Sequence, residues 1–387
     1  MPLSRRTFVS ALGLGGIGLM SPSPLGGRGS EARWASWTAA PGAKADAKAG
    51  ATTAALIRLD SNENPNGPGG RAFEALRAML GESNRYPDAA EVILVEAIAR
   101  AHGVRAENIV LGAGSGEILR MCVEAFTSTS RHLVSASPTF EPPEVFARLL
   151  GRPVVTVPVD GALRLDLDGM AAQSVGGGLV FFCNPNNPTA TVHGELAVKA
   201  FVARIRRASP ETVILIDEAY HEYVDDRTYA TAIPMATTDP RVVVSRTFSK
   251  VFGMAGLRVG YAIAHADTAR TLQAYRISSG TSVLALATAA TTISDQAHIA
   301  DEQRKNREAK AFTRTFFERA GYTVGPSETN FLMIDLRRDP MPVRVACRAH
   351  GIAVGRPFPP LDRWLRVSIG TMDEMRQATE VFRTVLG

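Results

Sequence analysis

The sequence has few of the features that mark metal-binding, disulfide-linked or membrane-spanning proteins. Its three cysteines, Cys122, Cys183 and Cys347, are far apart and form no Cys-x-x-Cys pair, and its seven histidines show no His-x-x-x-His spacing. We therefore expect no metal, and we expect the cysteines to be buried apolar residues. The apolar run at 11–20 is only ten residues long, whereas a membrane span needs ~20, so we expect no stable membrane insertion.

The chain also lacks a strong charge imbalance outside its first 50 residues. Those residues carry six Lys and Arg against two acids, which accounts for +4 of the net charge of +5. The rest of the chain is nearly neutral and gives no case for nucleic-acid binding.

The composition indicates one large enzyme unit of two subdomains, with 45% hydrophobic and 21% charged residues in a chain of 387. Aliphatic and β-branched strands are expected at 154–157, 179–183, 213–216 and 242–245, and they alternate with helical stretches at 91–101, 196–208 and 301–320. This alternation predicts an α/β fold with a mainly parallel central sheet and helices on both faces.

The most informative feature is the run from Ser245 to Gly260. One lysine, Lys250, follows the hydroxyls of Thr247 and Ser249 and precedes Arg258. A lysine that forms a Schiff base must lose its proton, and hydroxyls with a guanidinium hold a phosphate, so the run suits an aldehyde cofactor that carries a phosphate. The alternative is an ordinary solvated lysine where a strand meets a loop.

A carboxylate ends an earlier apolar strand. Asp217 follows 213–216, and Tyr220 comes three residues later. Ligands of open α/β sheets bind at the carboxyl ends of strands, so a buried Asp217 could keep a pyridine nitrogen protonated while Tyr220 reaches the 3'-oxygen of the ring. A helix cap is the alternative for an isolated Asp. The Asn-Pro loop at 184–189 could place an Asn over the ring edge.

A glycine turn at 112–116 follows a strand and precedes a helix. Free N–H groups in the first turn of a helix bind anions, so Ser115 and Gly116 are candidates for phosphate binding. The third glycine of a dinucleotide fingerprint is missing. Phe140 follows the strand expected at 131–136 and could stack on a flat ring, or could be a core residue.

Together these motifs resemble a known family, the fold-type I pyridoxal-phosphate enzymes of aminotransferase class I/II, in its histidinol-phosphate aminotransferase-like branch. The resemblance runs from about Leu56 to the C-terminus. The motifs occur in the family's order, at 59–65, 85–87, 112–116, 184–189, 217–220, 247–258 and 364–371.

The resemblance implies roles for individual residues. It assigns the Schiff base to Lys250, the pyridinium partner to Asp217, the ring-oxygen ligands to Tyr220 and Asn187, and the stacking ring to Phe140. It implies a phosphate site made of Ser115, Gly116, Thr247, Ser249 and Arg258. Arg366 would clamp the substrate's α-carboxylate and Asn62 would also face the substrate, while Tyr86 would reach the phosphate of a neighbouring subunit in a homodimer.

The reaction that this resemblance implies is amino-group transfer between an amino acid, or a histidinol-phosphate-like amine, and a 2-oxo acid, with pyridoxal 5'-phosphate on Lys250. Decarboxylation, racemisation or β-elimination on the same cofactor is a second hypothesis. A binding protein without turnover is a third.

Four positions depart from the family pattern. Ala190 replaces a glycine and Gly116 an acidic residue, whereas Asn66 and Arg356 change two positions that we expect at the substrate. We therefore expect an amino acid, aromatic or otherwise bulky and apolar, to be a better donor than histidinol phosphate.

The N-terminus indicates export. The segment 4–10, Ser-Arg-Arg-Thr-Phe-Val-Ser, and the glycine-rich run after it are typical of a twin-arginine signal, followed by a linker to residue 50. We expect Tat export to the periplasm; the alternative is a cytoplasmic protein with a basic extension. The predicted domains are the signal and linker at 1–50, a small domain at 51–80 and 283–387, and a large cofactor-binding domain at 81–282.

Overall fold

The computed structural model of the protein describes residues 56–387, which lie in one compact unit. The expected twin-arginine signal and the linker after it lie outside the described residues.

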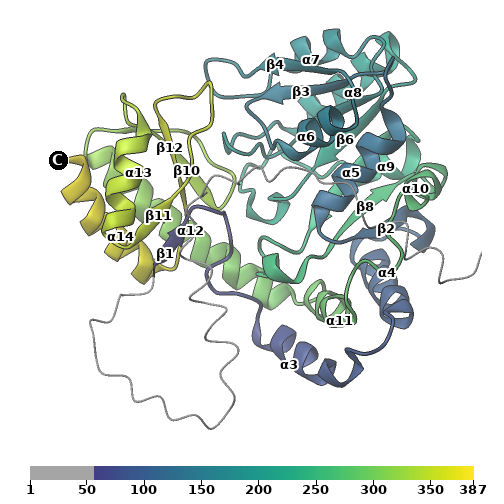
Figure 1. Cartoon of the computed structure of the whole chain (residues 1–387), viewed down its shortest axis with the longest axis horizontal. Helices are drawn as coiled ribbons and strands as arrows, with labels where there is room; N and C mark the ends of the chain where they lie inside the picture. Colours follow the sequence, from purple (N-terminus) through teal and green to yellow (C-terminus); the bar gives the residue numbers. More distant parts are fainter. Residues whose placement is uncertain (1–55) are drawn as a thin grey trace, which may run out of the picture. The chain divides into compact units, whose positions relative to one another are not determined.

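A seven-stranded sheet forms the centre of the fold, in the order β2-β8-β7-β6-β5-β3-β4 (Figure 1). Its strands are β2 (Ile109–Gly112), β3 (Leu133–Ser137), β4 (Val154–Pro158), β5 (Leu179–Cys183), β6 (Val213–Asp217), β7 (Val242–Thr247) and β8 (Gly260–Ala264). Only the two pairings of β8, with β2 and β7, are antiparallel. The predicted α/β fold with a mainly parallel sheet is confirmed.

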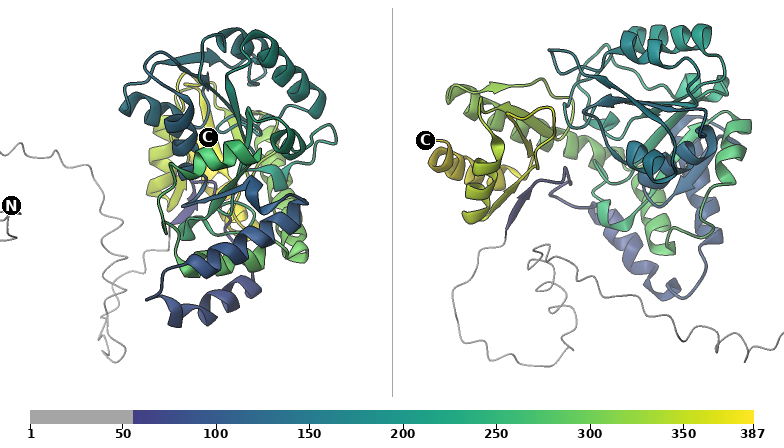
Figure 2. Two further views of the ribbon diagram at one scale, coloured as in Figure 1. Left: turned by 90° about the vertical axis from the view of Figure 1, so that its right-hand side faces the viewer. Right: turned by 45° about the horizontal axis from the view of Figure 1, so that its top comes forward.

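Helices cover both faces of this sheet (Figure 2), which explains why its strands are apolar on both sides. One face packs on α5 (Ser115–Phe126), α6 (Pro142–Leu149) and α10 (Ala266–Gln273). The other packs on α4 (Asp88–His102), α7 (Leu167–Gln173), α8 (Glu195–Ala208), α9 (Ile233–Thr238) and α11 (Val283–Thr292). Along β6, Leu215 belongs to the first core and Ile214 to the second, as the period of two along a strand requires.

The two ends of the described chain share a separate core, apart from the two cores of the large sheet. Strand β1 (Ile57–Leu59) pairs in parallel with β11 (Ile352–Val354), and β9 (Thr323–Val324), β10 (Phe331–Asp335) and β12 (Trp364–Ser368) form an antiparallel sheet. Their apolar residues pack with α13 (Pro340–Ala349) and α14 (Met372–Leu386). Figure 1 shows β1, in purple, beside these yellow-green C-terminal elements.

Helix α12 (Gln296–Arg319) connects the seven-stranded sheet to this C-terminal core. Ile299 near its start packs in the sheet core that contains α4 and α11, and Phe317 near its end packs in the core shared by the two chain ends. It begins earlier than the predicted 301, where the Asp295 side chain caps it by accepting from the backbone N–H of His298. The domain division at residues 81 and 283 stays a prediction. Helix α11 packs against both α3 (Gly70–Ala78) and α4.

Residues 56–387 contain no helix that combines the length and the apolar character of a membrane span. Over the same residues, no group of three or more His, Cys, Asp or Glu is placed to hold a metal ion. All three cysteines are buried and free of disulfides, as expected.

Candidate active site

A cavity of about 410 Å³ lies where β3, β5 and β7 end, and Lys250 is part of its wall. Residues from six other parts of the chain complete the lining, among them Asn62, Phe140, Asn187, Arg356 and Arg366. The carboxyl ends of parallel strands meet at one edge of the sheet, so residues distant in sequence converge there.

Lys250 lies in the turn after β7, and its Nζ donates a hydrogen bond of 3.1 Å to the carbonyl oxygen of Asn62. The Nζ atom is 5.3 Å from the centre of the Tyr220 ring. Burial and then the charge of Arg366 lower the pKa of the Lys250 ammonium from 10.5 to about 8. A much larger fraction of this lysine is therefore neutral near pH 8 than of an ordinary surface lysine.

Asp217 is the last residue of β6 and is only 1% exposed. Its Oδ1 accepts a hydrogen bond of 2.5 Å from the hydroxyl of Ser245. Burial raises the pKa of the Asp217 carboxyl to about 6, whereas the Ser245 hydrogen bond and the Lys250 charge act to lower it. The group is therefore mostly a carboxylate at neutral pH.

Tyr220 and Asn62 form a buried polar contact above these strands. The Asn62 Nδ2 donates to the Tyr220 hydroxyl at 3.1 Å, and the Ser368 hydroxyl donates to the Asn62 Oδ1 at 2.7 Å. Burial raises the pKa of the Tyr220 phenol well above its usual value, so it stays protonated and can donate a hydrogen bond. Asn62 has φ 54°, in the left-handed region that Asn tolerates better than most residues.

Arg366, on β12, reaches the same cavity from the C-terminal part of the chain. Its Nη1 donates to Asn187 Oδ1 and its Nη2 to the carbonyl oxygen of Asp60, both at 2.8 Å. Its buried Nε has no partner. Burial lowers the pKa of the guanidinium to about 10, so Arg366 is charged at neutral pH.

The predicted phosphate residues come together beside Lys250. Thr247 Oγ1 donates to Ser249 Oγ at 2.9 Å, and Arg258 Nη1 donates to the same oxygen at 3.3 Å. A Cβ added at Gly114 would meet Arg258 Nη2 at 2.2 Å, so this guanidinium lies against the turn that opens α5 with Ser115. No side chain caps that helix, and a Cβ added at Gly116 would meet nothing within 4 Å. Hydroxyls, a guanidinium and a helix N-terminus with open space beside it fit a phosphate.

The structure places three further predicted residues, Phe140, Tyr86 and Asn66, in different surroundings. Phe140 lines the cavity and also packs against the sheet core, and its stacking on a ring stays a prediction. Tyr86 is 84% exposed and lies outside the cavity. Asn66 was expected at the substrate, and this was wrong for the single chain: its amide donates to Glu302 at 2.7 Å in a separate small cavity, where its backbone N–H bonds to the side chain of Asn64.

Ser245, Phe358 and Glu141 are among the residues with contacts in the site that the sequence did not indicate. Ser245 donates a hydrogen bond to Asp217. The ring centre of Phe358 is 4.4 Å from Cζ of Arg356 and 4.5 Å from Cζ of Arg366. Glu141 forms an ion pair with Arg356, with 2.5 Å between the nitrogen and the oxygen. A serine directly after three valines of a strand was a usable signal for Ser245. No local pattern marks Glu141 or Phe358.

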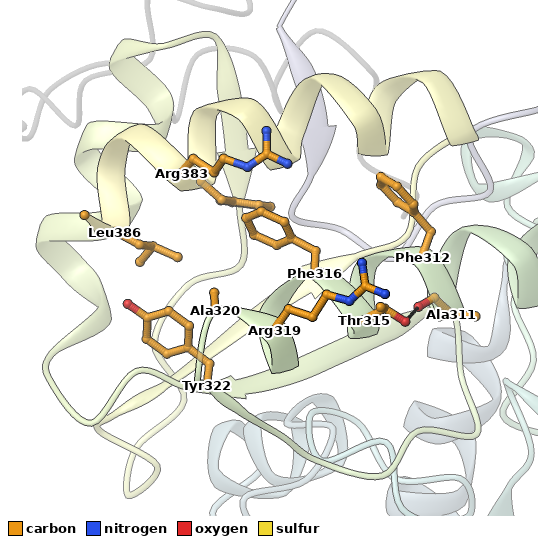
Figure 3. A pocket seen from close by; sticks show the side chains of 11 residues that line it. Ala311, Phe312, Thr315, Phe316, Arg319, Ala320, Tyr322, Arg383 and Leu386 are labelled. Carbon is orange, nitrogen blue, oxygen red and sulfur yellow. Dashed lines mark hydrogen bonds between the residues drawn. The ribbon is translucent and has the colours of Figure 1, made fainter.

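A larger cavity, of about 780 Å³, lies between α12 and α14, away from Lys250 (Figure 3). Phe312, Phe316 and Tyr322 supply much of its wall, with Arg319 and Arg383 beside them. The predicted catalytic and phosphate-binding residues all lie elsewhere, so the smaller cavity is the candidate active site.

Comparison with known proteins supports the family that the sequence motifs resemble. The family described as aminotransferase class I and II matches residues 54–382. The histidinol-phosphate aminotransferase of Moorella thermoacetica is 36% identical over 335 residues, 86% of each chain. Histidinol-phosphate aminotransferase 2 of Pseudomonas aeruginosa is 34% identical over 87% of this chain and 91% of its own. The crystal structure of the Sinorhizobium meliloti histidinol-phosphate aminotransferase in complex with pyridoxal-5'-phosphate has a TM-score of 0.80 at 27% identity, and the match covers 86% of this chain and 91% of that one.

Proposed function

Since the chain belongs to the class I and II aminotransferase family, we propose that it moves an amino group between an amino acid, or a histidinol-phosphate-like amine, and a 2-oxo acid, with pyridoxal 5'-phosphate as cofactor. The observation that carries the proposal is the position of Lys250. Its pKa is lowered to about 8, and it lies between the Asp217 carboxylate, the Tyr220 phenol and a phosphate site.

The residues in the cavity wall and next to it fit this cofactor. Asp217 would hold the ring nitrogen, Tyr220 and Asn187 the ring oxygen, and Phe140 a face of the ring. Ser115, Gly116, Thr247, Ser249 and Arg258 would hold the phosphate. When bound, the cofactor supplies an electron-withdrawing ring that takes up the electron pair released at the substrate's α-carbon.

The chain's own groups then bind the substrate and move its proton. Arg366 binds the α-carboxylate with a guanidinium that Asn187 and the Asp60 carbonyl hold in place. The Lys250 amine is neutral in a substantial fraction near pH 8, so its Nζ can accept the proton from the substrate's α-carbon. Nζ then donates that proton to the carbon atom on the other side of the amino nitrogen. Asn62 orients both Lys250 and Tyr220.

We propose an amino acid with a bulky side chain as the preferred donor. Arg356, which could bind a second anion, is already paired with Glu141 and packed on Phe358. A phosphate on the substrate would have to displace Glu141. Histidinol phosphate is the second candidate, favoured by the names of the relatives. The amino acid and histidinol phosphate each carry an anionic group, which suits the positive charge of Arg344, Arg356 and Arg366 in the cavity wall.

We propose that two chains share their active sites. Tyr86 is exposed, and so are the apolar side chains of Val92 and Ile93 on α4 and of Phe73 on α3. Exposed apolar side chains favour association, Tyr86 and Ile93 line the same surface cavity, and the family resemblance assigns Tyr86 to the partner's phosphate. From the sequence alone, we also propose twin-arginine export to the periplasm.

Borohydride reduction of the protein loaded with pyridoxal phosphate, followed by peptide mapping, tests the site. We expect the adduct on Lys250 and its loss in Lys250→Ala, since Schiff-base formation needs an amine at that position. Lys310→Arg is the matched control, because Lys310 is another buried lysine with a lowered pKa but lies against Ser327 and Thr329. An adduct on a different lysine would contradict the assignment.

Product analysis separates the reaction types. The protein is incubated with a panel of amino acids, with and without an added 2-oxo acid. Formation of a 2-oxo acid that depends on the added acceptor supports amino-group transfer. Release of an amine with carbon dioxide, or of the opposite enantiomer, would support the alternative reactions instead.

A further inference from the structure

Three neighbouring strands place a cysteine, an aspartate and a serine in one row. In the parallel register of the sheet, Cys183 of β5 is opposite Asp217 of β6, and Asp217 is opposite Ser245 of β7. Residues directly opposite each other on adjacent strands project from the same face of a sheet. The Asp217 carboxylate is therefore flanked on both sides, and all three residues are at most 1% exposed.

Ser245 and Cys183 make different contacts with the two carboxylate oxygens of Asp217. Ser245 Oγ donates to Oδ1 at 2.5 Å. Cys183 Sγ is 4.0 Å from Oδ2, but it is 3.3 Å from the carbonyl oxygen of Pro185. A thiol has one proton to donate, and the shorter contact directs it to Pro185. Oδ1 is thus occupied by a hydroxyl, and Oδ2 is left without a close donor.

We propose that Ser245 is a positioning residue that holds Oδ1 of Asp217, keeps this carboxylate charged in its buried position, and leaves Oδ2 as the oxygen that meets the cofactor's ring nitrogen. The inference rests on the proposed function, in which Asp217 pairs with that nitrogen. It adds a residue that does not itself touch the cofactor.

The charges around Asp217 show why a hydroxyl matters here. Burial raises the pKa of Asp217, and the neighbouring Glu218 raises it further. The Ser245 hydrogen bond opposes burial most strongly, followed by the charges of Lys250 and Arg246. Arg246 is itself paired with Glu218 and Glu222. Removal of the hydroxyl should therefore raise the pKa of Asp217 from about 6 into the neutral range.

The test compares pyridoxal phosphate binding to cofactor-free wild type, Ser245→Ala and Ser245→Thr as a function of pH. Affinity falls as the pH drops through the pKa of Asp217, because the protonated acid no longer pairs with a ring cation. A hydrogen bond to a charged group corresponds to about one to two pKa units, so the midpoint in Ser245→Ala should move up by that amount, with binding at pH 7 weaker by about two-fold for a shift of one unit and about ten-fold for two. The protonation of the free cofactor is the same in every measurement, so a difference between the pH midpoints of two variants comes from the protein.

Two controls distinguish positioning from a general structural effect. Ser245→Thr keeps a hydroxyl and should keep a midpoint near that of the wild type. Ser135→Ala removes another fully buried serine of the same sheet, whose hydroxyl contacts only the carbonyl of Ala136, and should shift nothing. Thermal unfolding of each variant checks that it folds.

A double-mutant cycle gives the decisive outcome. If Ser245 acts through Asp217, Ser245→Ala should change the Kd by less than about two-fold in an Asp217→Asn background. An equal loss in both backgrounds, or an unshifted midpoint in a folded Ser245→Ala protein, overturns the inference. Failure of the proposed function looks different, because the wild type itself would then bind no pyridoxal phosphate or carry the adduct on another lysine.

Discussion

Lys250 Nζ donates a hydrogen bond to the carbonyl oxygen of Asn62, a residue 188 positions earlier in the chain. The loop after β1 thereby closes over the carboxyl end of the seven-stranded sheet. Asn330 Nδ2 donates to the same carbonyl at 3.0 Å, which ties the C-terminal part of the chain to this point as well. The lysine's environment depends on all three segments at once.

The pH dependence of cofactor capture should follow Lys250. Only the neutral amine attacks an aldehyde, so the capture rate should rise with pH through about 8. Arg366→Met removes a positive charge that lowers the pKa of Lys250, so its midpoint should move upward. Stopped-flow absorbance across neutral and alkaline pH measures both midpoints. Arg363→Met, which alters an exposed arginine paired with Asp335, is the control.

The same lysine affects stability with a defined sign. Its folded-state pKa of about 8 is below its ordinary value of 10.5, so the unfolded chain binds more protons between these values. The contribution of Lys250 to the free energy of unfolding should therefore increase as the pH rises from 8 to 10.5. Comparison of denaturant midpoints of cofactor-free wild type and Lys250→Met over this range checks it, and parallel curves would contradict the lowered pKa.

Substrate preference should depend on Arg366. Arg366→Ala should raise the KM for an amino acid by a factor that corresponds to ~2–4 kcal/mol, the usual cost of removing one member of a desolvated charge pair. We expect an aromatic or bulky apolar amino acid to have a higher kcat/KM than histidinol phosphate. The comparison is made on wild type, Arg366→Ala and Arg363→Ala. A ten-fold advantage for histidinol phosphate would show that the Glu141–Arg356 pair does not exclude it.

The turn after Lys250 should tolerate no side chain at Gly253. This residue has φ 65°, and an added Cβ would come within 2.2 Å of the backbone of Gly67. Gly253→Ala should lower the free energy of unfolding by at least about 2 kcal/mol, since both the left-handed backbone and the clash are costly. Gly256→Ala, where a Cβ meets nothing within 4 Å, is the matched control for the thermal unfolding measurement.

The exposed Tyr86 should contact the cofactor's phosphate only in a dimer, where it reaches the site of the partner subunit. Tyr86→Phe should weaken pyridoxal phosphate binding by about ten-fold, the cost of a hydrogen bond to a charged phosphate, while the fold is unchanged. Sedimentation establishes the oligomeric state, and Tyr322→Phe, at the distant cavity, is the control. A monomeric protein with full affinity would remove the shared-site proposal.

Export should require the paired arginines. Arg5→Lys combined with Arg6→Lys should leave the protein in the cytoplasm with its leader intact, whereas the wild type should be periplasmic and shortened. Fractionation followed by mass spectrometry of the N-terminus measures this. Normal export of the double-lysine variant would exclude the twin-arginine interpretation.

The sequence by itself determined the elements and the chemistry of their ends. Apolar runs such as 213–216 form buried strands because both faces of a parallel sheet are covered, and Asp217 was assigned to a binding edge because ligands meet strands at their carboxyl ends. The order of motifs identified the family, which the comparison with known proteins confirmed. These are local properties of the chain, and they were predictable for that reason.

Only the tertiary structure decided which residues meet across the chain. The strand register that places Ser245 opposite Asp217 depends on how whole strands pair, and the Glu141–Arg356 ion pair joins residues 215 positions apart. Ala190, at the family's glycine position, is fully buried and adopts φ 63°, a conformation that no local propensity of alanine favours. Such contacts arise from packing between distant segments, and short-range patterns carry no information about them.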